Sequence, residues 1–310
     1  MSKVTSAMNE FIEYFFFSIV NQIARRLSFR TAGKVGAWLG NAVFSFTPIR
    51  KKITLENLKT SFPEKSQAEI EAIARGAYRN YGIALVESLW AGGQSAETLR
   101  GVLRVANPEV MVQARAQQRG VLFLSAHYGS WELLPSSVRL NIDTPLAMIF
   151  QRQRNKRIDA LFEKNRSRFD NVTIPMGISS RKALSALADN YVVLMLGDQS
   201  GPKEAVFVDF FGRPAATHRG VAAFSLKTGA PIVMGFVVRQ SDGTYTITFE
   251  EVDRSGLDSY SEEHIIELTR RHVVILEQWI RKHPDHWLWM HKRWKHMPHY
   301  ESQRLVEEEA

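Results

Sequence analysis

The sequence predicts an α/β fold in which a mixed sheet is flanked by helices and preceded by a helical region. From residue 120 onward, short runs of Val, Ile, Leu and Phe alternate with helical segments, which is typical of a sheet with helices on its faces. The 310 residues are 45% apolar, enough for a large core. The chain has no Cys, which excludes disulfides, a thiolate nucleophile and a Cys-based zinc site.

Residues 1–28 predict an amphipathic helix that associates with a membrane. Its longest uncharged run, residues 14–24, has eleven residues, whereas about 20 are needed to span a bilayer. The first 60 residues hold nine Lys or Arg against three Glu, so we expect the helix to lie in an anionic membrane interface. The alternative is a helix packed on the protein's own core. The apolar positions that recur every four residues are Phe11, Phe15, Ile19 and Ile23.

The remaining elements follow in order. Residues 29–105 predict a helical region, in which Ser66 and Glu69 form a capping-box pattern that opens a helix toward Trp90. An α/β region over 106–300 and a polar tail over 301–310 follow. Strands are expected at 121–126, 146–150, 172–174, 191–196, 206–210, 231–239 and 245–252. Helices are expected near 131–140, 155–168, 179–189, 217–228 and 261–282.

A His followed five residues later by an acid is the first candidate site. Chance alone predicts about one such pair in a chain of this composition, and three occur. His272 with Glu277 falls in a predicted helix, where a spacing of five places the side chains on different faces, and His296 with Glu301 follows no strand. Only the third pair lies where a buried strand runs through a short turn into a helix, the usual position of catalytic groups in α/β enzymes. That pair is His127 with Glu132.

His127 could remove a proton from a hydroxyl, since an imidazole titrates near neutrality, and Glu132 would orient it. The alternative is a His that only caps the following helix. Ser125 and Ser130 flank the imidazole, but the sequence has no G-x-S-x-G elbow there. Direct transfer without a covalent intermediate is therefore the simpler hypothesis.

Two further segments carry polar groups after strands. Residues 151–169 are strongly basic, which indicates a phosphate on a lipid or carrier, a solvated helix face or, less well, a nucleic acid. Asp198 follows a hydrophobic strand and could orient an Arg or the His, or make a turn.

The C-terminal stretch holds five of the nine His, between residues 283 and 299, together with Trp287, Trp289 and Trp294. We expect a membrane edge there rather than a metal site.

Together, these segments resemble the bacterial late acyltransferases of lipid A biosynthesis, the lauroyl and myristoyl acyltransferase family. The H-x-x-x-x-E dyad of that family matches His127 and Glu132. Gln151 stands where the family often has an Arg. The other matching segments, in chain order, are Asn57-Leu58, Phe62-Pro63-Glu64, the helix with Glu87, Asn155 with Arg166 and Arg168, Asp198 in LGDQ, FFGRPAATHRG, TGAPIVMGFVVR and HPDHWLWMHKRWK.

The resemblance implies a glycerolipid-acyltransferase-like fold, with 106–300 as the catalytic region. It implies transfer of a fatty acyl chain from an acyl carrier protein or coenzyme A thioester to a hydroxyl of a lipid A precursor. His127 would be the base, Glu132 its orienting acid, and Asp198 would position Arg166. The oxyanion donors would be Arg166 or backbone N–H groups at Tyr128, Gly129 and Ser130. The side chains expected to bind substrate are Arg152, Arg154, Asn155, Arg168 and Gln199.

The resemblance implies no metal and no cofactor. The expected partners are an anionic glycolipid, acyl carrier protein and the membrane surface, but no nucleic acid. The expected location is the cytoplasmic face of a bacterial inner membrane, with peripheral or monotopic attachment. The alternatives are an acyltransferase for another lipid, such as a phosphatidylinositol mannoside or an aminolipid, and a non-catalytic membrane or nucleic-acid binding protein.

Overall fold

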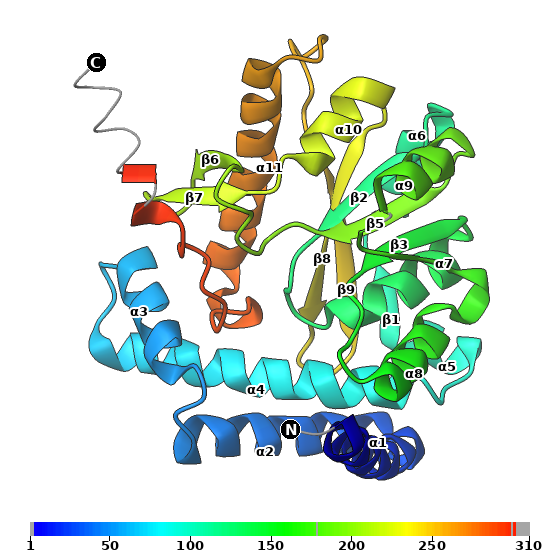
Figure 1. The fold of residues 1–310 in the computed structure, drawn as a ribbon, viewed down its shortest axis with the longest axis vertical. Coiled ribbons are helices and arrows are strands. Elements are labelled where there is room, and N and C mark those ends of the chain that lie inside the picture. Colours follow the sequence, from blue (N-terminus) through cyan, green and yellow to red (C-terminus); the bar gives the residue numbers. More distant parts are fainter. Residues whose placement is uncertain (1–2, 178, 299, 302–310) are drawn as a thin grey trace.

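A layer of helices lies beside a twisted α/β sheet in the computed structural model, which describes residues 3–177, 179–298 and 300–301 (Figure 1). The polar tail expected over 301–310 lies outside the described residues except for Glu301. The helices are α1 Lys3–Arg26, α2 Phe29–Phe46, α3 Lys51–Ser61, α4 Gln67–Ala91, α5 Ala96–Val102, α6 Pro108–Ala116, α7 Leu134–Ile142, α8 Lys156–Arg166, α9 Ser179–Ala188, α10 Gly220–Thr228 and α11 Glu262–Lys282.

The main sheet has seven strands in the order β1-β9-β8-β2-β5-β3-β4, and β8 and β9 are its antiparallel neighbours. A separate hairpin pairs β6 with β7. The α/β class expected from the sequence is confirmed. The strands are β1 Leu103–Val105, β2 Val121–Ser125, β3 Leu146–Phe150, β4 Val172–Pro175, β5 Val192–Leu196, β6 Val206–Asp209, β7 Pro214–Thr217, β8 Ile232–Arg239 and β9 Tyr245–Glu251.

Two short strands depart from the sequence prediction. β1 lies inside the region expected to be helical, and it joins the main sheet beside β9, so the helical region and the sheet share an element. β7 follows β6 after a tight turn and was not predicted as a strand. Both have only three or four residues, too few to show a period of two in the sequence.

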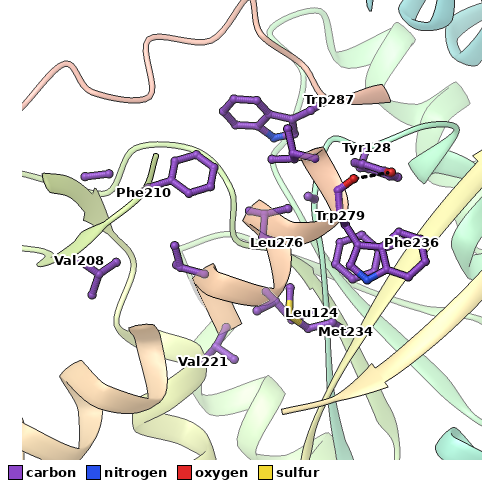
Figure 2. Close-up of a cluster of buried hydrophobic side chains, with 14 of the residues drawn as sticks. Leu124, Tyr128, Val208, Phe210, Val221, Met234, Phe236, Leu276, Trp279 and Trp287 are labelled. Carbon is purple, nitrogen blue, oxygen red and sulfur yellow. Dashed lines mark hydrogen bonds between the residues drawn. The ribbon is translucent and has the colours of Figure 1, made fainter. Parts of the chain in front are cut away.

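The sheet is covered on both faces, so its central strands are apolar on both sides. Along β2, Leu122 and Leu124 belong to one core cluster, whereas Val121 and Phe123 belong to the other. Figure 2 shows the first cluster, where Leu124 of β2 lies near side chains of β8 and α11. Between β8 and α11, Phe236 stacks on Trp279 with ring centroids 4.6 Å apart.

The helical layer is centred on α4. The predicted capping box is present, because Ser66 Oγ accepts from the Glu69 N–H and the Glu69 carboxylate accepts from the Ser66 N–H. α2 packs closely along α4: a Cβ placed on Gly40 would lie 2.2 Å from the Tyr78 carbonyl oxygen, and one on Gly36 would lie 2.6 Å from the Gly82 oxygen. α1 and α2 lie on the side of α4 that faces away from the sheet (Figure 1).

α1 has one side packed on the protein, as the second alternative expected, and one side exposed. Asn21 and Ala24 are buried, and the Trp90 indole donates to the Leu27 carbonyl just after the helix, so one side packs on the protein. The other side exposes a row of large apolar residues. Within the part of the chain that the structure describes, no helix has the length and apolar content to cross a bilayer.

Candidate functional site

The adjacent strands β2 and β5 bring His127 and Asp198 together. The two strands are parallel and Ser125 is in register with Leu196. His127 and Asp198 each follow these residues by two positions, so they leave the same edge of the sheet side by side. This edge, at the carboxyl ends of parallel strands, is where open α/β sheets place their sites.

Asp198 is held by three donors. Its carboxylate accepts from His127 Nδ1 at 2.8 Å, from the His127 backbone N–H at 3.0 Å and from the Trp287 indole N–H at 2.9 Å. Only 2% of the Asp198 side chain is exposed. Burial raises the Asp198 pKa, but the His127 charge and these hydrogen bonds outweigh it, so the pKa is lowered.

His127 has the complementary shift. Burial lowers its pKa, but the negative charges of Asp198 and, more weakly, Glu132 outweigh that effect, so the pKa is raised above its ordinary value. Because Nδ1–H donates a hydrogen bond to the Asp198 carboxylate, Nε2 is the nitrogen left to accept a proton from a reactant. Gln199 Nε2 lies 3.5 Å from His127 Nε2. The Trp131 ring packs edge-on against the imidazole, with centroids 5.1 Å apart.

Glu132 pairs with Arg166. Arg166 Nη2 donates to one Glu132 oxygen at 2.8 Å and Nε to the other at 3.3 Å, a two-pronged contact of the kind that fixes a guanidinium plane. Phe150 and Phe162 pack on the guanidinium, with ring centroids 5.3 and 5.4 Å from its carbon. The third nitrogen, Nη1, is buried, and no partner for it is found among the described residues.

The observed pairs correct the pairing expected from the sequence. We expected Glu132 to orient His127 and Asp198 to position Arg166, but Asp198 holds His127 and Glu132 holds Arg166. The physical reason is strand order: β5 is the direct neighbour of β2, so its terminal acid reaches the imidazole. Glu132 lies one turn further on, in a short 3₁₀ helix, and meets the end of α8.

The backbone donors of the loop are mostly engaged. The Tyr128 N–H donates to the Ala126 carbonyl and the Gly129 N–H to the His286 carbonyl. Gly129 has a φ of +56°, and a Cβ there would lie 1.9 Å from the Val237 oxygen, so only Gly fits. Of the three expected oxyanion donors, only Ser130 has a backbone N–H for which the described residues show no bond to another backbone carbonyl.

The other residues expected to bind substrate lie apart from His127. Arg154 pairs with Glu13 of α1 at 2.7 Å, and Asn155 caps α8 and donates to the Glu10 carbonyl. Arg152 lies 3.4 Å from Asp159. These contacts join α8 to α1. The Arg168 guanidinium donates to two carbonyls at the end of α4, those of Ala91 and Gln94.

Two hollows border the site along α4. The larger is an open hollow of about 420 Å³, solvent space included, and Glu132, Arg166 and Arg168 line it together with Ser88 of α4. The smaller encloses about 180 Å³, and His127 and Trp131 line it. Tyr81 of α4 lines the smaller one and stacks on Trp131, with centroids 6.0 Å apart. Each ion pair therefore has its own access to the surface.

The C-terminal segment supplies a residue that the sequence interpretation missed. Trp287, Trp289 and Trp294 were expected at a membrane edge, but all three are buried. The Trp287 indole N–H donates a hydrogen bond to Asp198. The prediction of a membrane edge there is wrong, because aromatic and basic composition does not show which side chains face the core. Residues 3–177, 179–298 and 300–301 contain no group of three His, Cys, Asp or Glu side chains arranged to hold a metal ion.

A second, buried hydrogen-bond network contacts the loop after β2, and the sequence interpretation also missed it. Ser130 Oγ donates to the Tyr245 hydroxyl at 2.7 Å, and that hydroxyl donates to Glu87 of α4. Glu87 is fully buried beside Arg239, 3.4 Å away. Burial raises the Glu87 pKa to about 7, although Tyr245 and Arg239 each lower it. The signal available in the sequence was Glu87, an acid within a helix that the family resemblance matches.

An imidazole held by a buried carboxylate at the carboxyl ends of parallel strands, with a carboxylate–guanidinium pair that begins five residues further along the chain, is the arrangement of an α/β enzyme site built for acid–base chemistry. The chain belongs to the bacterial lipid A biosynthesis acyltransferase family, whose model matches residues 2–296. It is therefore an enzyme of a family that transfers acyl groups, as the resemblance implied.

Curated relatives agree with this assignment. The chain is 26% identical over 274 residues to the lipid A biosynthesis palmitoleoyltransferase of Escherichia coli strain K12, covering 88% of this chain and 87% of the relative. It is 25% identical over 273 residues to the lauroyltransferase of the same organism, covering 86% and 85%. It is 24% identical over 290 residues to the myristoyltransferase, covering 86% and 88%.

Proposed function

We propose that this enzyme transfers a fatty acyl chain from a thioester donor to a hydroxyl of a lipid A precursor. The observation that carries the proposal is the His127–Asp198 pair, in which the carboxylate holds Nδ1 at the end of a strand and leaves Nε2 as the basic nitrogen. An acceptor hydroxyl needs a base because it is only weakly acidic near neutral pH, and this is the base that the site offers.

In the proposed reaction, His127 Nε2 takes the proton of the acceptor hydroxyl while the hydroxyl oxygen attacks the thioester carbonyl carbon. The carbonyl electrons move to oxygen and form a tetrahedral oxyanion. When the oxyanion collapses, the carbon–sulfur bond breaks, and the leaving thiolate takes the proton from the imidazolium. The negative charge of the buried Asp198 carboxylate stabilises that imidazolium throughout, and Asp198 does not take the proton itself.

Arg166 is the proposed donor to the oxyanion. Its Nη1 is the buried nitrogen for which the described residues offer no partner, and the Glu132 contact fixes the plane in which it points. A fixed cation in a partly dry site stabilises developing negative charge without reorganising. The Ser130 N–H is the second candidate donor.

The proposed donors and location follow from charge. Acyl carrier protein and coenzyme A are both anionic, as are lipid A precursors with phosphates, and the chain carries a net charge of +8. We place the enzyme at the cytoplasmic face of the inner membrane, with the apolar row of α1 in the lipid interface. We propose no cofactor and no metal for the reaction.

The test is acyl transfer by the purified protein to a defined lipid A precursor. Acyl-acyl carrier protein and acyl-coenzyme A are supplied in separate arms, and phosphatidylinositol mannoside and an aminolipid serve as competing acceptors. We expect transfer to the lipid A precursor, lost in His127→Ala and kept in His264→Ala, whose imidazole lies at the start of α11 and contacts Ser259. Full transfer by His127→Ala would contradict the proposal, and preference for another acceptor would correct the substrate.

A further inference from the structure

In α2, most of the large apolar side chains are exposed, and small residues face the protein. In a water-soluble helix, the large apolar residues face the core. Here, most of the buried residues are small, namely Ala32, Gly33, Gly36 and Gly40, and one large apolar residue, Phe44, is buried near the end of the helix. Close approach of the α2 and α4 backbones requires these small residues, as the short Cβ distances at Gly36 and Gly40 show.

The outer face of α2 consequently carries the bulk of its apolar surface. Trp38 is 68% exposed and Phe46 is 86% exposed. Val35 and Leu39 lie on the same helix face and are also exposed, and Ile49 follows just after the helix. Single exposed apolar residues are common, but a row of large ones over about three turns is not, so something other than water is expected to cover it.

α1 and α2, the two helices with rows of exposed large apolar side chains, lie on the same side of the molecule. In Figure 1, both helices lie beyond α4 on the side away from the sheet, with α1 seen nearly end-on. We call the exposed apolar residues of these two helices the apolar layer. The exposed apolar residues of α1 are Met8, Phe11, Ile12, Phe15, Phe16, Ile19, Val20 and Ile23.

Cations bracket this layer, and they indicate what covers it. Arg26, Arg30 and Lys34 are exposed around the start of α2, and Arg50 and Lys52 are exposed beyond its end. Each cation near a membrane surface adds to the attraction for anionic lipids, while the apolar face between them is buried among the acyl chains.

We propose that the outer face of α2, together with α1, lies in the interface of an anionic lipid bilayer, so that two helices and not one attach the enzyme. This goes beyond the acyl-transfer proposal and does not depend on it. Tyr81 and Ser88 of α4 line the two hollows of the site. α4 packs directly on α2, so the two helix layers of α2 and α4 lie between the proposed lipid surface and the sheet edge that carries the site.

The absence of Cys allows a direct test on the full-length chain. Single variants Phe15→Cys, Trp38→Cys, Phe46→Cys and Tyr260→Cys are made, the last as a control whose side chain is 59% exposed in the loop before α11. Each is nitroxide-labelled and mixed with vesicles of phosphatidylglycerol and phosphatidylethanolamine, or of phosphatidylcholine alone. Collision rates with oxygen, which enriches in lipid, and with a water-soluble nickel complex then report the depth of each label.

We expect the labels at 15, 38 and 46 to enter the lipid of the anionic vesicles and the label at 260 to stay in water. If the label at 15 enters lipid while 38 and 46 stay in water, α1 alone attaches the protein and the proposal is overturned. If the labels at 38 and 46 are immobilised without vesicles while the protein is dimeric by light scattering, a second copy covers α2, which also overturns it. No substrate is present, so failure here leaves the acyl-transfer proposal untouched.

A vesicle flotation assay measures the size of the effect. Trp38→Ser combined with Phe46→Ser is compared with Tyr260→Ser combined with Ile266→Ser, a matched loss of exposed apolar side chains on and before α11. We expect binding to anionic vesicles to weaken by on the order of tenfold or more in the first variant, because each lost anchor removes a buried side chain. Equal binding of the two variants would contradict the proposal.

Discussion

The two ion pairs of the site differ in what surrounds them. Asp198 is closed off from solvent and fully bonded, so its pair with His127 sets the protonation of one nitrogen. Glu132 has 27% of its side chain exposed at the edge of a hollow, and its partner Arg166 keeps a buried nitrogen to which the described residues offer no acceptor. We call the His127–Asp198 pair, whose acid is buried, the buried pair, and the Arg166–Glu132 pair, whose acid is partly exposed, the open pair. The buried pair is suited to moving a proton, and the open pair is suited to presenting positive charge.

Removing the charge of the buried pair should have the largest effect. Asp198→Asn leaves the shape intact but removes the carboxylate that holds Nδ1–H and stabilises the imidazolium. We expect kcat to fall by about 10²- to 10⁴-fold, the range of an acid–base contribution. Steady-state kinetics measures the loss, and the melting temperature checks folding. A fall of less than about threefold would show that the pair does not carry the chemistry.

The open pair should have the next largest effect. Arg166→Gln removes the proposed oxyanion donor, so we expect kcat to fall by about 10²-fold with little change in KM, since the contact strengthens only in the transition state. Arg166→Lys should recover little because a single ammonium cannot make the two-pronged contact with Glu132. An effect confined to KM would place Arg166 in ground-state binding instead.

The network beneath the loop should have a smaller effect. Glu87→Gln weakens the hydrogen bond that holds Tyr245, and through it Ser130. We expect kcat to fall about two- to tenfold at unchanged KM, the size of one hydrogen bond. Tyr245→Phe should behave alike, and the double variant should be no worse than either single one. Additive losses would show that the two residues act independently.

The smallest effect is expected in the basic segment after β3. Arg154 pairs with Glu13 on the surface of α1 and α8 and does not approach His127 in the structure. Exposed pairs contribute little, so Arg154→Gln should change kcat and KM by less than about twofold. A large rise in KM would restore the substrate-binding role expected from the sequence.

Local signals in the sequence predicted local structure well. The capping box at Ser66 and the apolar strand before His127 need only their immediate neighbours, and both were found. The residues alone left open whether Asp198 meets an Arg or the His, because the answer depends on β5 lying next to β2. Trp287 was missed because burial of an aromatic side chain is a tertiary property, and β1 because three residues show no periodicity.

The central claim is that Asp198, and not Glu132, sets the proton affinity of His127. The measurement is the pH dependence of kcat/KM for the parent enzyme, Asp198→Asn and Glu132→Gln. A general base must be unprotonated, so activity falls on the acid side through the His127 pKa, which lies above its ordinary value in the parent. We predict that Asp198→Asn moves this acid limb to lower pH by more than Glu132→Gln does. A larger shift in Glu132→Gln, or no shift in Asp198→Asn, would contradict the account.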